Sequence, residues 1–320
     1  MYTLIGSLLI AAAVCGQASA QAWPSKPVKL IVSQAAGATP DIVARMLADR
    51  ITRALGQQFV VDNRPGAGNV IGAQAVARAP GDGYTFFFAT AAPLVSNPFT
   101  FKSLPYDPDR DFMPVAMVGK IHFFILVNPK VPAKTLPELI ALDKAQPGKL
   151  AFASDGPRNF SGMLGEWINK LAGTKMLLVP YAKMPEGVQD TIAGRTQIVI
   201  LAVPSAAPRM KSGDLRAIAA SAAKRTPGYE DVPSVAETFP GFDFTGWFVI
   251  VAPTGTPAAV VQQLNREMDK VLKDPEVVQK LREFGMFTDG AETPEATAEY
   301  IRVQRAAWGK LVKEIGLQPE

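Results

Sequence analysis

The sequence predicts an α/β protein of two lobes, each built on a doubly wound, mainly parallel sheet. Short apolar strands alternate with helical patterns from Val28 onward, which is typical of parallel sheets flanked by helices. The 320 residues also exceed the size at which a single core stops growing. Apolar strands near Leu126 and near Gly246 are candidates for crossings between lobes. We therefore expect a first lobe of residues 21–125 and 246–320, and a second lobe of residues 126–245 inserted into it, with a cleft between them.

The first lobe begins with a strand over 28–32, a polar loop over 34–40 and a helix from Asp41 to Gly56. The alternation then continues along the chain. Further strands are expected at 59–61, 84–89, 122–127, 150–153, 176–179, 197–201, 215–220 and 244–251. Further helices are expected at 70–78, 136–144 and 163–171, and in a helical tail from Pro257 with breaks near Pro275 and Pro294.

Residues 1–20 have the features of a secretory signal peptide. Leu4 to Val14 is almost entirely apolar, and Ala18-Ser19-Ala20 supplies the small-x-small pattern of a cleavage site. This apolar segment is too short to span a bilayer in a stable way. Cys15 raises the alternative of a lipoprotein signal, but Val14 stands where a small residue is expected. We expect export to the periplasm by the general secretory route.

Composition excludes several kinds of chemistry. The single cysteine lies in the signal peptide, and the single histidine, His122, lies in an apolar strand where we expect it to be packed. A disulfide framework, thiol chemistry and a His-rich metal site are thereby excluded. No G-x-S-x-G nucleophile elbow and no P-loop occur. The net charge of +4 is spread along the chain, which argues against nucleic acid and favours small anions. We expect no catalytic residue, no metal and no cofactor.

Polar loops follow several strands, at the edge where ligands bind in open α/β sheets. The loop 34–39 precedes a helix, so its N–H groups and the helix dipole favour an anion, although a plain strand-to-helix turn explains it equally well. The loop 154–161 occupies the same position in the other lobe. It contains Arg158, whose guanidinium matches a carboxylate or pairs with Asp155. Residues 90–97 form a third polar loop.

Specific short motifs are distributed over the whole chain. They are Trp23-Pro24-Ser25-Lys26-Pro27, the loop 35–41, Asp62-Asn63-Arg64-Pro65-Gly66-Ala67-Gly68, Pro80-Gly81-Asp82-Gly83-Tyr84-Thr85, Leu104-Pro105-Tyr106-Asp107, Val179-Pro180-Tyr181, Lys211-Ser212-Gly213-Asp214-Leu215-Arg216, Asp231-Val232-Pro233-Ser234 and Ala252-Pro253-Thr254-Gly255-Thr256-Pro257. With these motifs the chain resembles the substrate-binding proteins of tripartite tricarboxylate transporters, the Bug or TctC family. The resemblance implies a Venus-flytrap, periplasmic-binding-protein fold that presents a small organic carboxylate to the membrane components of such a transporter.

The resemblance also implies which residues face the ligand. From the first lobe they are Ala36, Gly37, Ala38, Thr39, Thr90, Ser96 and Asn97. From the second lobe they are Ser154, Asp155, Gly156, Arg158, Asn159, Phe160, Ser161, Tyr181, Ala182 and Leu201.

Two of these residues depart from the family pattern. Arg158 stands where small residues are usual, and Leu201 stands where an aspartate that suits a ligand amine is frequent. The departures imply a ligand that lacks an amine and carries one or two carboxylates on an apolar body. Aromatic dicarboxylates and medium-chain aliphatic diacids both fit, and Phe160 favours the aromatic acids. We expect a monomer whose lobes close on the ligand.

Two other functions compete with transport. An enzyme would need a general base, and Asp41, Asp155 and Lys183 are the candidates in the cleft. Asp41 is explained as a helix N-terminal residue, and no two titratable groups are paired in the way that acid–base catalysis favours. The other alternative is a periplasmic sensor that feeds a two-component system. The sequence does not separate sensing from transport, because both use the same closed state.

Overall fold

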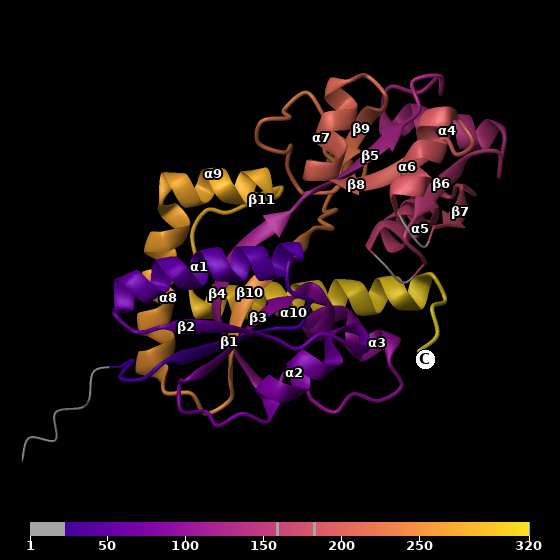
Figure 1. The fold of residues 1–320 in the computed structure, drawn as a ribbon. Coiled ribbons are helices and arrows are strands. Elements are labelled where there is room, and N and C mark those ends of the chain that lie inside the picture. Colours follow the sequence, from indigo (N-terminus) through magenta and orange to yellow (C-terminus); the bar gives the residue numbers. More distant parts are fainter. Residues whose placement is uncertain (1–22, 158–159, 182–183, 320) are drawn as a thin grey trace, which may run out of the picture.

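The computed structural model describes residues 23–157, 160–181 and 184–319, which form two lobes with a sheet in each (Figure 1). The first sheet contains β1 (Val28–Val32), β2 (Phe59–Asn63), β3 (Thr85–Thr90), β4 (Phe112–Ile121), β10 (Gly246–Pro253) and β11 (Met286–Phe287). The second contains β5 (Phe123–Val127), β6 (Ala151–Ser154), β7 (Leu177–Pro180), β8 (Ile198–Ala202) and β9 (Arg216–Ala220). The strand orders are β11-β4-β10-β3-β1-β2 and β7-β6-β8-β5-β9.

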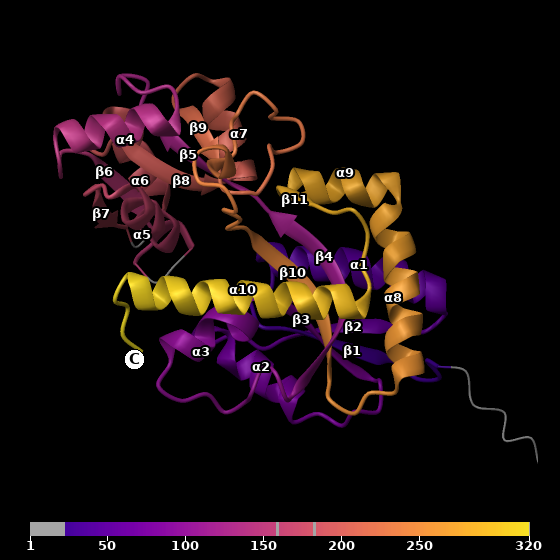
Figure 2. The same ribbon diagram turned by 180° about the vertical axis from the view of Figure 1, so that it is seen from behind.

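Helices cover both faces of each sheet. The first lobe has α1 (Thr39–Leu55), α2 (Val70–Ala77), the π-helical turn η2 (Ala92–Ser96), α3 (Asn97–Thr100), α8 (Ala258–Lys273), α9 (Pro275–Glu283) and α10 (Pro294–Glu314). The second has α4 (Leu136–Ala145), α5 (Phe160–Ala172), α6 (Met184–Ala193) and α7 (Val203–Lys211). Figure 2 shows α10 crossing the first lobe, with its C-terminal end beneath the second.

The two-lobed α/β fold is confirmed, but both sheets are mixed rather than mainly parallel. β1 pairs in parallel with β2 and β3, whereas β10 runs antiparallel to β3 and β4. In the second sheet β6 is parallel to β7 and β8, and β5 is antiparallel to β8 and β9. The strands β5 and β10 bring the chain into each sheet from the other lobe. They are therefore antiparallel to their neighbouring strands, whereas strands joined by a helical crossover within one lobe are parallel.

The chain changes sheet between Ile121 and Phe123, and returns between Ala220 and Gly246. The expected division at 125/126 thus falls inside β5, while the one at 245/246 coincides with the start of β10. The exact lobe boundaries remain a proposal.

Alternating side chains divide the interior into layers. In β3, Phe86 and Phe88 belong to the core beneath α1 and α8, while Phe87 and Ala89 belong to the core on the side of α2 and α10. This second core continues into the other lobe, where it includes Ile125 of β5 and the inner face of α5. The lobes are therefore joined by packed side chains as well as by the crossing strands.

Candidate functional site

The loop after β1 is held by the carboxylate of Asp41. Asp41 is 2% exposed and accepts hydrogen bonds from the Gly37 N–H at 2.8 Å, from Asn63 Nδ2 at 2.8 Å and from Arg45 Nε at 3.1 Å. The Ala38 N–H is also engaged, because it donates to the Ala35 carbonyl at 3.2 Å. Two of the backbone N–H groups that were expected to be available to an anion, those of Gly37 and Ala38, therefore form hydrogen bonds within the loop itself. Ala36 and Thr39 are exposed beside it.

Burial of Asp41 opposes ionisation, but the hydrogen bonds from Arg45, Gly37 and Asn63 outweigh it and lower the pKa of this carboxyl. A lowered pKa contributes stability that is fully present above about pH 4 and is lost as the pH falls through the native pKa. Asp41→Asn is therefore expected to lower the free energy of unfolding at pH 7 by about 1–3 kcal/mol. The difference from the unmodified chain should narrow below about pH 4.

Urea denaturation at pH 7 and at pH 3 measures this difference. Asp49→Asn is the matched control on the same helix, because the Asp49 side chain is 67% exposed and pairs only with Arg53 in the described structure. A difference of the same size at both pH values would contradict the role assigned to the Asp41 charge.

The turn after β2 holds the same loop from the other side. Its backbone has positive φ at Gly66 (125°), Ala67 (47°), Gly68 (58°) and Asn69 (75°), which explains the two glycines of the motif and the asparagine that follows it. Asn69 Oδ1 accepts a hydrogen bond from Gln34 Nε2 at 2.9 Å. The motif that carried the family resemblance therefore positions the first loop.

Sequence reasoning missed the positioning roles of Gln34, Asn63 and Asn69. Besides its bond to Asn69, Gln34 Nε2 donates to Thr90 Oγ1 at 3.4 Å, which connects the ends of β1 and β3. Asn63 Nδ2 also donates to the Gln34 carbonyl at 3.1 Å. The one available signal was the placement of two asparagines at the ends of a glycine-rich turn.

The segment 90–97 was expected to be a polar loop, and that expectation is wrong. Residues 92–96 form the π-helical turn η2 and residues 97–100 form α3. Each begins with a proline in its first turn, at Pro93 and Pro98, where the fixed φ favours a helix start. Thr90 and Ser96 are half-buried at this edge. The Asn97 amide is 4% exposed and donates to the Gly68 carbonyl at 2.8 Å, so it ties η2 to the turn after β2.

The loop after β6 is built around two serine hydroxyls. Ser154 is fully buried, lies 3.0 Å from Ser161 Oγ and accepts a hydrogen bond from the Gly156 N–H at 3.0 Å. Ser161 also accepts from the Asp155 N–H at 3.3 Å and donates to the Asp155 carboxylate. Gly162 permits this compact shape, since a Cβ there would lie 2.1 Å from the Gly156 carbonyl oxygen. Arg158, Asn159 and Ala182 lie outside the described residues, as do Lys183 and residues 1–20, for which a signal peptide is predicted.

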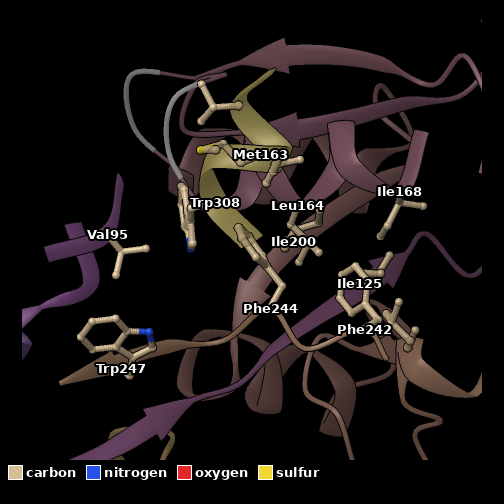
Figure 3. Close-up of a cluster of buried hydrophobic side chains, with 14 of the residues drawn as sticks. Val95, Ile125, Met163, Leu164, Ile168, Ile200, Phe242, Phe244, Trp247 and Trp308 are labelled. Atoms are coloured by element: carbon tan, nitrogen blue, oxygen red, sulfur yellow. The ribbon is translucent and has the colours of Figure 1, made fainter. Parts of the chain in front are cut away.

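Phe160 lies at the start of α5 with a ring against each of its faces. Its centroid is 4.0 Å from that of Phe123 and 4.3 Å from that of Phe244, both nearly parallel to it. Phe244 in turn lies 5.0 Å from Trp308 of α10. Figure 3 shows Phe244 and Trp308 in the core between the lobes. The ring of Phe160 thus packs against both crossing segments, which removes the reason for preferring an aromatic ligand.

Tyr181 and Leu201 are the other described candidates of the second lobe; Tyr181 follows β7 and Leu201 lies in β8. The Tyr181 hydroxyl donates to Asp190 at 2.7 Å, and burial together with this carboxylate raises the tyrosine pKa. Leu201 is 6% exposed and lines an open groove of about 430 Å³ with Met184, Val188 and Ser205 among others. Leu201 presents only carbon to this groove.

Two helices that begin at these edges have no side-chain cap within the described chain. Ala38 is the N-cap of α1 and Ala202 is the N-cap of α7. By contrast, α4, α9 and α10 begin with a threonine or aspartate that accepts from the first turn. The helices α2, α3 and α8 also begin without a side-chain cap, so the feature is not confined to α1 and α7. The Val203 N–H of α7 already donates to the His122 carbonyl at 3.2 Å, and Pro40 and Pro204 have no N–H, so only the remaining first-turn N–H groups of α1 and α7 are open to an acceptor.

His122 is packed, as the sequence indicated, although it falls between β4 and β5. Its Nδ1 lies 3.0 Å from Thr226 Oγ1, and its ring stacks on Phe287. Burial, with a smaller effect of Lys120, lowers its pKa to about 4, so it is neutral at pH 7. In the described ranges no group of three or more His, Cys, Asp or Glu side chains is placed to hold a metal ion. None of the helices in those ranges is long and apolar enough to cross a membrane.

The fold, with a loop after a strand of each sheet leading to a helix, defines a two-lobed α/β protein of the solute-binding class. Residues 43–317 match the model of the tripartite tricarboxylate transporter family receptor. A UPF0065 protein of Bordetella bronchiseptica is 37% identical over 99% of this chain and 93% of its own length. BugT of Bordetella pertussis is 33% identical over 99% of this chain and 97% of its own. The chain belongs to the tripartite tricarboxylate transporter receptor family, which includes the Bug proteins.

Solved structures agree with this assignment. Rpa4515 of R. palustris with adipate is 31% identical, covers 93% of this chain and 100% of its own, and superposes with a TM-score of 0.76. A periplasmic transporter is 36% identical with a TM-score of 0.75, covering 93% of this chain and 99% of its own. MatC from Rhodopseudomonas palustris with bound malate is 27% identical with a TM-score of 0.71, covering 91% of this chain and 100% of its own.

Proposed function

We propose that this protein is exported through the signal peptide of residues 1–20 and captures a small organic dicarboxylate in the periplasm. It presents the ligand, as a monomer, to the membrane components of a tripartite tricarboxylate-type transporter, and it has no enzymatic activity. The observation that carries the proposal is the pair of loops 34–38 and 154–157. They follow strands of different sheets and lead toward helix N-termini, as ligand loops of α/β proteins do.

The proposed ligand is a medium-chain aliphatic diacid. Leu201 offers no partner for an amine, and Phe160 has no uncovered ring face on which an aromatic acid would stack. Arg158, as the sequence places it, adds a positive charge to the second loop. The adipate in the Rpa4515 structure and the malate in the MatC structure are both dicarboxylates without an amine.

Isothermal titration calorimetry with adipate, terephthalate, citrate and aspartate tests the ligand class. Adipate is expected to bind most tightly, and aspartate is expected to bind at least about tenfold more weakly, because its amine would be buried without a partner. Tight binding of aspartate would overturn the argument from Leu201.

Small-angle scattering with saturating adipate tests capture between the lobes. The radius of gyration should fall on binding, since only a closed form contacts the ligand from both sides. An unchanged radius at saturation would count against capture by closure.

A further inference from the structure

Two buried indole N–H groups near the junction of the lobes have no acceptor among the described residues. They belong to Trp247, at the start of β10, and to Trp308, on α10. Trp247 is 1% exposed and Trp308 is 6% exposed. Buried donors are almost always paired in native proteins, so an unpaired one calls for an explanation. Trp23 differs from these two tryptophans, because its Nε1 donates to the Gly83 carbonyl at 2.9 Å. Buried donors without a partner in the described structure also occur at Ser33 Oγ, Arg216 Nε and Thr297 Oγ1, but only the two indoles lie at the junction beside the candidate ligand residues of both lobes.

Trp308 lies between the segments that carry the candidate ligand residues of the two lobes. On the first lobe, α10 packs along η2, which contains Val95 and Ser96. Toward the second lobe, the ring of Trp308 contacts Phe244, which stacks on Phe160 at the end of the loop after β6. The surroundings of Trp308 are therefore continuous with the proposed ligand site.

Trp247 lies beside the same edge of the first sheet. Phe248, the residue after Trp247, pairs with Thr90 of β3. The ring of Trp247 contacts the ring of Tyr300 on α10, with 6.0 Å between the centroids. Figure 3 shows the indole nitrogens of Trp247 and Trp308 turned toward one space, with Val95 on one side and Phe244 on the other. The side chains of Val95 and Phe244 contain no acceptor, and no other described residue accepts from either nitrogen, so both donors are available to a ligand.

We propose that Trp247 and Trp308 donate hydrogen bonds to the distal carboxylate of the diacid, an inference that rests on the proposed function. A carboxylate accepts from neutral N–H groups in charge-assisted bonds, which a water-excluding apolar surrounding strengthens. A monocarboxylate of the same length would leave both donors unpaired. A site of this kind rejects the analogue that lacks the polar group far more strongly than an apolar pocket does.

Calorimetric titration with adipate and with hexanoate tests the pairing on the full mature chain. Trp308→Phe and Trp247→Phe are each expected to weaken adipate binding by about tenfold or more, and to change hexanoate binding by no more than about twofold. Trp167→Phe is the matched control, because Trp167 packs on Phe242 and Phe244 in the same aromatic cluster. It should leave both affinities unchanged. Equal weakening of the two acids in the Trp308 and Trp247 variants would mean that the rings only pack, and would overturn the proposal.

A second measurement follows the indole N–H groups of the unmodified chain directly. The four tryptophans give four indole N–H resonances in a ¹⁵N-labelled sample, and the variants assign them. Adipate should move the Trp247 and Trp308 resonances downfield, and hexanoate should not. Resonances that stay in place at adipate saturation would identify the partners as internal water and refute the proposal. If the chain binds neither acid, the proposed function fails and this inference with it. Equal affinity for both acids overturns this inference alone.

Discussion

Replacing Phe244 with alanine should lower the free energy of unfolding by about 3–5 kcal/mol. Phe244 is 2% exposed and contacts Phe160 at 4.3 Å, Trp308 at 5.0 Å and Trp167 at 5.2 Å between ring centroids. These partners come from both lobes, so neither lobe can collapse alone to fill the cavity. Equilibrium unfolding in guanidinium chloride, followed by circular dichroism, measures the loss.

The Phe244 substitution should also separate the unfolding of the lobes, because their shared core runs through this ring. We expect two transitions in place of one. Phe284→Ala is the control, since Phe284 is half-buried at the end of α9 and packs within the first lobe only. Phe284→Ala should lower the free energy of unfolding by less than Phe244→Ala does, and should leave the number of unfolding transitions unchanged. A single transition with a loss below about 1 kcal/mol in Phe244→Ala would show that the lobes are not joined through this stack.

Gly162→Ala should distort the loop after β6 and strongly weaken ligand capture. The added methyl carbon would lie 2.1 Å from the Gly156 carbonyl oxygen and 2.9 Å from Ser154 Oγ, so the loop has to move. Overpacking of this kind costs about 1–3 kcal/mol of stability. A displacement of about 1 Å in a site built for one geometry costs up to about a hundredfold in function, and we expect a loss of adipate affinity of that order.

Thermal unfolding and adipate titration of the same sample separate the two effects of Gly162→Ala. Gly246→Ala is the matched control, because its methyl carbon would meet Ile121 and Phe123 at 3.4 and 3.5 Å, which are ordinary contact distances. The control should retain most of the affinity. Unchanged adipate binding in Gly162→Ala would remove the loop after β6 from the ligand site.

The regular parts of the fold followed from the sequence because their patterns are local. Val43, Leu47 and Ile51 are fully buried at helical spacing on α1, and Gly56 ends that helix with a φ of 70°. The predicted strand over 28–32 coincides with β1. The tail was expected to be helical with breaks, and only the short strand β11 interrupts the helices there.

Other elements were hidden by proline. Pro114 concealed β4, although proline is tolerated where one side of a strand lacks a partner. In the described structure Pro114 pairs with Val251 of β10 on one edge of β4, whereas β11 reaches only Lys120 and Ile121 on the other edge, which has no strand partner at Pro114. Prolines also obscured α7, which has Pro208 inside it, and η2. Pairing between remote segments, such as Gln34 with Asn69, has no periodic signal at all.

Some of the candidate site could be anticipated and some could not. The loops after β1 and β6 were recognised because small and polar residues between a strand and a helix have a physical meaning. The covered faces of Phe160 and the unpaired N–H groups of Trp247 and Trp308 depend on contacts between lobes. Both tryptophans look like ordinary core residues in the sequence.

The position of β10 has a consequence for how the chain is made. This strand lies between β3 and β4 in the first sheet, yet it is synthesised after the whole of β5 to β9. The first sheet cannot close before residue 253 is available, whereas the second sheet is complete by residue 220. Long-range pairing of this kind is slow. If the protein is exported as proposed, a precursor whose N-terminal half lacks its central strand would stay open during passage across the membrane, and the finished lobe would form only on the far side.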